Sequence, residues 1–327
     1  MKTESLLKYF KTVLFWLVTI YSISTVGSSY SSSNIEKLRN TRNCSRCNLH
    51  EADLEGLYLR NAILEEADLS EAKLDRADLR NALLENADLS NASLEGANFR
   101  GANLSNVNFE GTKLENVLID EQTTIDPKWF LVWQITNRLT EEQNLSFTDL
   151  EGANLSGINL RNYNLKEANL KRANLNDTNL GDANLNETIL REASLVFSNL
   201  KESNLSFSDL REANLNNAEL SNADLTSADI REASLKNANL QMANLSNTNL
   251  RKADLSYVNF KGANLQNADL QGANLTEATL VDVDLRGANL KDTNLSNAYL
   301  RTSGLNNIQL CGATMPNGDR YICPDDF

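Results

Sequence analysis

Residues 211–240 read REANLNNAELSNADLTSADIREASLKNANL, with a large apolar residue at every fifth position. The same spacing holds from Leu150 to Leu310, where 31 of the 33 central positions are leucine. It also holds from Leu49 to Leu114, which adds 14 central positions. A short and strict period of this kind predicts a solenoid of stacked repeats rather than an ordinary globular domain.

Neither regular secondary structure accounts for this period. Leucine at every fifth residue drifts around an α-helix and alternates between the two faces of a strand. A small residue stands two places before most centres, and it is alanine at 19 of the 33 positions in the longer block. Because residues two apart share one face of an extended segment, each pentapeptide is expected to turn both residues inward. The polar Asn, Asp, Ser and Gly residues that follow favour a bend.

These short sides can bury their leucines only by coiling and stacking, so that each coil supplies partners for the next. Burial of one leucine contributes roughly 1.5–3 kcal/mol. The repeated burial is therefore expected to outweigh the low β-propensity of Ala, Asn and Asp.

Triplets such as Ala52-Asp53-Leu54, Ala153-Asn154-Leu155 and Ala223-Asp224-Leu225 resemble the pentapeptide-repeat family, over about residues 49–119 and 145–315. The resemblance implies an all-β fold, a right-handed quadrilateral parallel β-helix with four pentapeptides per coil. We expect two repeat segments, 49–119 and 145–315, with short capping and linker helices. Exported members from cyanobacteria are the most similar group.

The first 28 residues differ in character from the repeats. Three lysines precede an apolar run over residues 12–23, and small residues follow it. This order is typical of a secretory signal peptide, cleaved after Gly27 or Ser28. The alternative is an uncleaved membrane anchor, but an apolar run of about 12 residues is short of the ~20 that span a bilayer. We expect export to the periplasm, a thylakoid lumen or the medium, with no stable membrane anchor after cleavage.

Residues 29–48 are expected to cap the N-terminal end of the solenoid. Residues 30–43 are predicted to form a short helix, with Ser33 or Asn34 as its N-cap and Ile35 and Leu38 as its apolar face. A cap is needed because a bare solenoid end exposes apolar core and an unpaired strand edge.

The four cysteines form two local pairs, Cys44 with Cys47 and Cys311 with Cys323. In an exported chain these pairs are disulfide candidates, one near each end of the repeats. A thioredoxin-like redox motif is the alternative for Cys44 and Cys47, but it requires a βαβ context that this chain lacks.

Residues 120–144 interrupt the period and shift its register by one residue. Asp126 followed by Pro127 is typical of a helix start. The helix expected over residues 128–138 carries Trp129, Phe130 and Trp133 close together. It either packs on the solenoid and fills a joint between two stacks, or it offers an aromatic docking surface to a partner. Residues 316–327 are assigned to a C-terminal tail.

No pattern of residues points to catalysis. The sequence lacks a glycine-rich phosphate loop and a G-x-S-x-G elbow, and its single histidine, His50, falls in an outward position. The carboxylates also occupy outward positions, where solvated charge is the ordinary expectation. We therefore predict a protein that is not an enzyme, with no cofactor and no metal site.

The net charge of the chain indicates which classes of partner it can bind. The chain has a net charge of −13. Residues 49–119 hold 14 acidic and 6 basic residues, and residues 145–310 hold 20 acidic and 15 basic residues. Nucleic acid is not expected as a ligand, because like charges repel. The leading prediction is an exported scaffold or protein-binding solenoid. The alternative is an acidic DNA mimic that inhibits a nucleic-acid-binding enzyme such as gyrase, which some members of the family do.

Overall fold

The computed structural model describes residues 29–139, 143–301 and 308–323. The predicted signal peptide, residues 1–28, lies outside this described part. The chain divides into two compact units, unit 1 ending at Trp129 and unit 2 beginning at Phe130, and each is described by itself. Among the described helices, none is long and apolar enough to cross a membrane.

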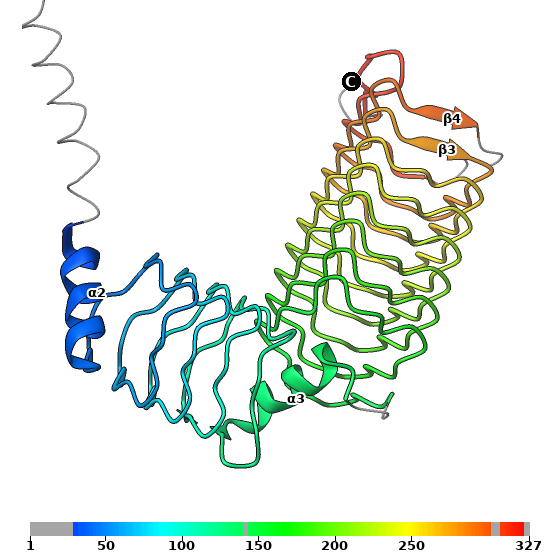
Figure 1. Cartoon of the computed structure of the whole chain (residues 1–327). Helices are drawn as coiled ribbons and strands as arrows, with labels where there is room; N and C mark the ends of the chain where they lie inside the picture. The colour runs from blue at the N-terminus through cyan, green and yellow to red at the C-terminus, as the bar shows by residue number, and fades with distance from the viewer. Residues whose placement is uncertain (1–28, 140–142, 302–307, 324–327) are drawn as a thin grey trace, which may run out of the picture. The chain divides into compact units, whose positions relative to one another are not determined.

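Both units are built from stacked coils with four sides (Figure 1). Most bridge partners are parallel and lie 20 residues apart, for example Asn214 with Ser234 and Asp224 with Asn244. Four pentapeptides therefore complete one coil, which agrees with the implied quadrilateral β-helix. The regular strands are short because each side is only a few residues long.

One pentapeptide of unit 2 shows how each side is held. Leu215 donates its N–H to the Ser234 carbonyl of the next coil at 2.7 Å, and Ala218 donates back to Leu215 at 3.1 Å across the turn. Between them, Asn217 adopts a φ of +60° and donates its N–H to Lys236 at 2.8 Å. A left-handed residue recurs at this position along both units, most often Asn, Asp, Glu or Gly. The pentapeptide is thus a short extended side closed by a left-handed corner.

The core consists of the inward pair that the period predicted. Leu215 and Ala218 are 0% and 1% exposed, and the same burial recurs at central and small positions along both units. Where serine or threonine replaces alanine, its buried hydroxyl donates to a leucine carbonyl, as Thr178 does to Leu155 at 2.8 Å. The hydroxyl therefore costs little to bury, because its hydrogen bond is replaced inside the core.

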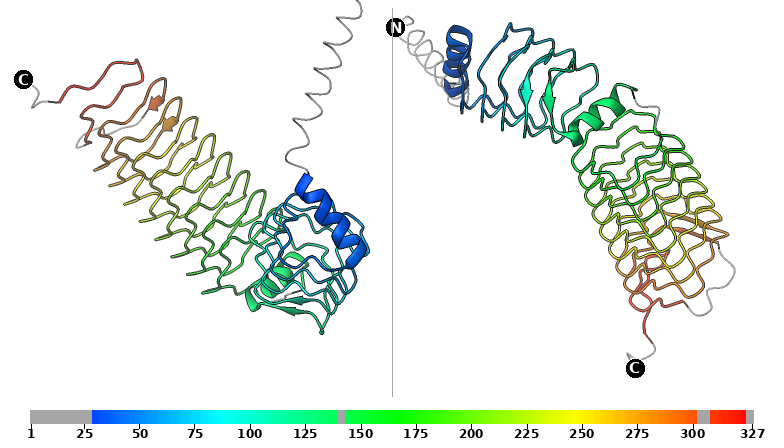
Figure 2. Two further views of the ribbon diagram at one scale, coloured as in Figure 1. Left: turned by 90° about the vertical axis from the view of Figure 1, so that its left-hand side faces the viewer. Right: turned by 90° about the horizontal axis from the view of Figure 1, so that it is seen from below.

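Helix α2 (Ser29–Thr41) lies across the N-terminal end of unit 1 (Figure 2). It buries Leu38, as expected, but Ser33 and Asn34 lie inside the helix, so the predicted N-cap is wrong. The Asn34 side-chain amide donates to the Asn48 carbonyl at 2.8 Å. In the next coil, the corresponding carbonyl of Asp68 accepts from the backbone of Leu49. Asn34 thus replaces the donor that a preceding coil would have supplied.

Unit 1 extends beyond both ends of the predicted segment 49–119. Its first bridge joins Asn43 to Ile63, so the first coil begins six residues earlier. At the other end, strands β1 (Asn103–Leu104) and β2 (Thr124–Ile125) pair in parallel with a separation of 21 residues. The extra residue lies in a turn where the Asp120 carboxylate accepts from the Gly101 N–H at 2.9 Å. This turn absorbs the predicted shift in register.

Helix α3 (Pro127–Thr136) begins at the predicted proline, directly after Asp126. The division between the two units falls within this helix. Trp129 is 7% exposed and meets Phe109 edge-on, with ring centroids 5.9 Å apart. Trp129 therefore belongs to the core of unit 1.

Unit 2 ends in an irregular coil and a folded-back tail. Strands β3 (Thr279–Val281) and β4 (Tyr299–Arg301) pair in parallel. Parallel bridging continues to Thr314, which also pairs antiparallel with Arg320. The tail thus reverses direction over the last coil and covers part of the strand edge that a parallel stack leaves open.

Candidate interaction surface

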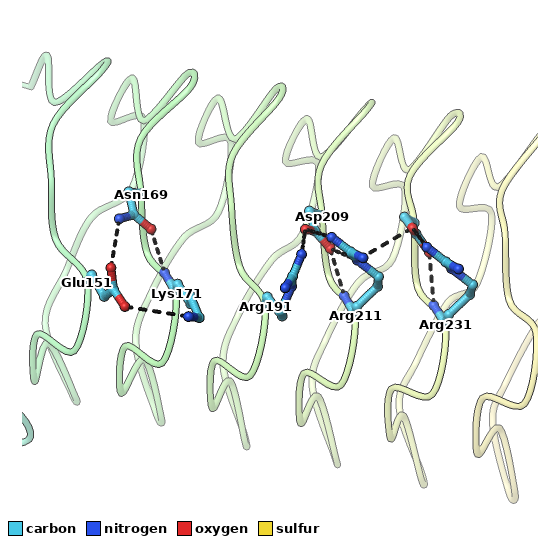
Figure 3. Close-up of polar contacts among 8 residues, drawn as sticks. Glu151, Asn169, Lys171, Arg191, Asp209, Arg211 and Arg231 are labelled. Atoms are coloured by element: carbon cyan, nitrogen blue, oxygen red, sulfur yellow. Dashed lines mark hydrogen bonds and ion pairs between the residues drawn. The ribbon is translucent and has the colours of Figure 1, made fainter.

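One side of unit 2 carries a column of cations, one in each of five consecutive coils. The column consists of Lys171, Arg191, Arg211, Arg231 and Arg251. Each occupies the first turn position after an extended side, so all five belong to the same side of the stack. Figure 3 shows the first four of them, from Lys171 to Arg231. At a rise of about 4.8 Å per coil, the cations follow one another at roughly the spacing of β-strands.

The middle of this column is a continuous chain of ion pairs, which we call the charged ladder: Arg191, Asp209, Arg211, Asp229 and Arg231. Arg211 grips Asp209 with two hydrogen bonds, from Nε at 2.7 Å and from a terminal nitrogen at 2.6 Å. Arg231 grips Asp229 in the same way, at 2.8 and 2.6 Å. Arg191 reaches Asp209 at 3.4 Å, and Arg211 reaches Asp229 at 3.6 Å. The ladder thus links three coils without a break.

The Asp209 carboxylate of the ladder is held in its charged form. The hydrogen bond from Arg211 lowers the pKa of Asp209, against an opposing effect of partial burial. The hydrogen bond to Asp229 likewise raises the pKa of Arg231. The five side chains are 23–42% exposed, so each pair contributes little to stability. Stability alone does not account for the alignment of these charges.

A second cluster lies at the start of the column. Glu151 accepts from Arg172 at 2.8 Å and from the Asn169 amide at 3.2 Å, and both bonds lower the pKa of Glu151. Lys171 lies 3.8 Å from the same carboxylate (Figure 3). The first cation of the column, Lys171, therefore also has a carboxylate partner.

The side chains of this surface supply charge and hydrogen bonds. Arginine and aspartate in stable ion pairs offer neither a nucleophile nor a base that titrates near neutral pH. Within the described residues, no three His, Cys, Asp or Glu side chains are placed to hold a metal ion. The guanidinium groups offer planar donors that suit carboxylates and backbone carbonyls.

The structure brings together both predicted cysteine pairs. Cys44 and Cys47 form a disulfide with a Cα–Cα distance of 5.2 Å, and Cys311 and Cys323 form another at 4.9 Å. Cys44 and Cys47 occupy the central and small inward positions of the first coil and are 0% and 6% exposed. The disulfide closes a corner of that coil from within.

The aromatic residues of α3 separate into core and surface. Trp129 is buried, so it is not available to a partner. Phe130 is 40% exposed and stacks on Trp133, with ring centroids 5.7 Å apart. A docking role for Phe130 and Trp133 stays a prediction.

Sequence analysis did not identify the cation column. The signal is present as REASL at residues 191–195, REANL at 211–215 and REASL at 231–235. A comparison of residues 20 apart, as four pentapeptides per coil require, would have revealed it.

One family model matches the repeats of both units. Eight copies of the family model described as Pentapeptide repeats match residues 43–81, 82–118, 144–182, 168–206, 178–217, 203–241, 243–280 and 280–315. No curated protein matches the chain.

Solved structures of other pentapeptide repeat proteins are similar to this chain. HetL, which is involved in heterocyst differentiation regulation in the cyanobacterium Nostoc sp. strain PCC 7120, is 26% identical with a TM-score of 0.32, covering 88% of this chain and 97% of HetL. A protein of the Arabidopsis thaliana thylakoid lumen is 29% identical with a TM-score of 0.24, covering 31% of this chain and 67% of that protein. QnrB1, a plasmid-mediated fluoroquinolone resistance protein, is 21% identical with a TM-score of 0.26, covering 76% of this chain and 92% of QnrB1.

Proposed function

We propose that this chain, which belongs to the pentapeptide repeat family, is an exported, non-catalytic solenoid that binds a protein partner through its charged ladder. The observation that carries the proposal is the alignment of Arg191, Arg211 and Arg231 on one side of unit 2. Arginine is enriched at protein interfaces, because its planar guanidinium group carries a charge and can also stack on other flat groups.

The ladder is held in place before any partner arrives. The two-pronged bonds from Arg211 to Asp209 and from Arg231 to Asp229 restrict side chains that would otherwise lose entropy on binding. The Nη1 nitrogen of Arg211 has no acceptor among the described residues, so its N–H groups remain available to a partner. Donors that are already ordered and have no acceptor favour binding, because little entropy is lost when a partner arrives.

The binding function can be tested by site-specific photo-cross-linking in cells. A photoreactive residue at Glu212, on the corner beside the ladder, is expected to capture a defined partner. Arg211→Gln with Arg231→Gln is expected to abolish this cross-link, because the donors are lost. Lys201→Gln with Lys261→Gln, on another side of unit 2, serves as the control. A cross-link that survives the arginine changes, or that both pairs of changes weaken equally, would contradict the proposal.

The alternative of a DNA mimic receives no support from the charge pattern. Duplex DNA presents one negative charge per about 1.7 Å of its axis, without interruption. The side of unit 2 that holds the ladder instead adds a cation in each of five successive coils, from Lys171 to Arg251. A partner that expects a line of phosphates would meet positive charge there.

Export is proposed from the leader at residues 1–28 and from the cysteine pairs. Disulfides persist in oxidising compartments, so Cys44–Cys47 and Cys311–Cys323 would act as staples for the two ends. The expected intact mass lacks about 27 or 28 N-terminal residues and does not change on treatment with a thiol label. Full-length protein with four labelled thiols in the cytosol would overturn this part of the proposal.

We also infer that the coil is right-handed. Connections between parallel strands of one sheet are right-handed in nearly all proteins, because the strands themselves twist to the right. A crystal structure showing left-handed coils would refute this inference.

A further inference from the structure

A second side of unit 2 is almost free of charge over four consecutive coils. We call the outward residues within 202–207, 222–227, 242–247 and 262–267 the neutral strip. Glu202 and Asp224 are the two charged residues among them, whereas 23% of the whole chain is charged. The strip consists mainly of amide and hydroxyl side chains on successive coils, at a rise of about 4.8 Å per coil.

The amides of the strip are ordered by hydrogen bonds within and between coils. Asn204 accepts from the Ser206 N–H at 3.0 Å and from its hydroxyl at 2.6 Å. The Asn264 amide donates to Asn244 at 3.0 Å. Each amide has two N–H donors, so Asn264 keeps one for a ligand. The side-chain amide of Gln266 has no partner in the part of the chain that the structure describes. The strip therefore combines ordered side chains with amide groups, on Asn264 and Gln266, that can still form hydrogen bonds.

Apolar side chains lie at the two edges of the strip rather than at its centre. Phe207 is 60% exposed on one corner, and Met242 is 58% exposed on the other. Protein interfaces have the opposite layout, an apolar centre within a polar rim. This arrangement argues against a protein as the occupant of the strip.

We propose that the neutral strip binds a neutral polysaccharide. Sugar hydroxyls both donate and accept hydrogen bonds, so they complement the unspent groups of Asn264 and Gln266. The apolar face of a sugar ring can pack on Phe207, whose ring is large and rigid. Anionic polymers are disfavoured because Glu202 lies within the strip and Asp282 lies just beyond it, in a chain of net charge −13. Four coils make a strip of roughly 15 Å, long enough for several sugar rings.

The opposite side of the coil provides an internal control. Phe197 is 62% exposed there and has a φ of +58°, close to the +61° of Phe207. Its surroundings differ, because the matching outward residues of four coils include six charged side chains: Glu192, Glu212, Glu232, Lys236, Lys252 and Asp254. A ligand that selects a neutral surface should distinguish the two phenylalanines.

The test is affinity electrophoresis of the full-length protein in gels containing hydroxyethyl cellulose, which is neutral, or carboxymethyl cellulose, which is anionic. We expect retardation by the neutral polymer only. Phe207→Ala is expected to weaken this binding about fivefold or more, since one stacking contact is lost. Phe197→Ala is expected to leave it unchanged. Both phenylalanines are exposed, so circular dichroism should show the same fold for both variants.

Three results would overturn the proposal. The first is a wild-type protein that the neutral polymer does not retard. The second is equal or stronger retardation by carboxymethyl cellulose, which would indicate charge-driven binding. The third is an equal loss in Phe197→Ala and Phe207→Ala, which would place the contact outside the neutral strip.

Discussion

Leu225→Ala is expected to lower the free energy of unfolding by about 2–5 kcal/mol. Leu225 is 0% exposed at the centre of a pentapeptide in the middle of unit 2, with buried Ala223 beside it. Backbone hydrogen bonds join this coil to both neighbours, from Leu225 N–H to Asn244 and from Leu205 N–H to Asp224, so the coils can collapse little into the space left behind. Urea denaturation followed by circular dichroism measures the change.

Lys252→Ala is the control for this substitution. Lys252 pairs with Glu232 at 3.1 Å, but the two side chains are 71% and 53% exposed. Exposed pairs of this kind contribute about 0.2–1 kcal/mol. If Leu225→Ala cost no more than Lys252→Ala, the leucine column could not be the main source of stability.

Asn217→Pro is expected to destabilise unit 2 by about 3 kcal/mol or more, through the backbone rather than the core. Asn217 has a φ of +60°, whereas the proline ring holds φ near −65°. Proline also removes the N–H that donates to Lys236 at 2.8 Å. The same denaturation experiment measures the loss.

Asn217→Gly tests whether the corner geometry is the cause. Glycine adopts positive φ without strain and keeps the N–H, so we expect a change within about 1 kcal/mol. Asn217 is exposed, so neither variant alters the core. Equal losses in the glycine and proline variants would show that the asparagine side chain matters more than the backbone conformation.

Features that depend on residues close together in the sequence could be predicted. The inward pair of each pentapeptide follows from the five-residue period, and burial at Leu215 and Ala218 confirms it. The start of α3 at Pro127 follows from Asp126 and Pro127, because their preferences act within one turn of helix. Both of these features are set by residues next to one another in the sequence.

Contacts between distant residues explain what could not be predicted. Asn34 was expected to cap its own helix, yet its amide serves the Asn48 carbonyl of the first coil. Trp129 was grouped with Phe130 and Trp133, yet its contact with Phe109 makes it core. Sequence proximity does not show which of several similar side chains finds a partner elsewhere in the chain.

The sequence alone determined the solenoid and its inward residues, because both depend on a pattern repeated every five residues. Only the tertiary structure decided which outward residues share a side. Asp209 meets Arg191, and Asn264 meets Asn244, because one coil takes 20 residues. The number of residues in a coil is set by how the corners close and stack. The contacts that join neighbouring coils in the charged ladder and the neutral strip are therefore defined only when the chain is wound.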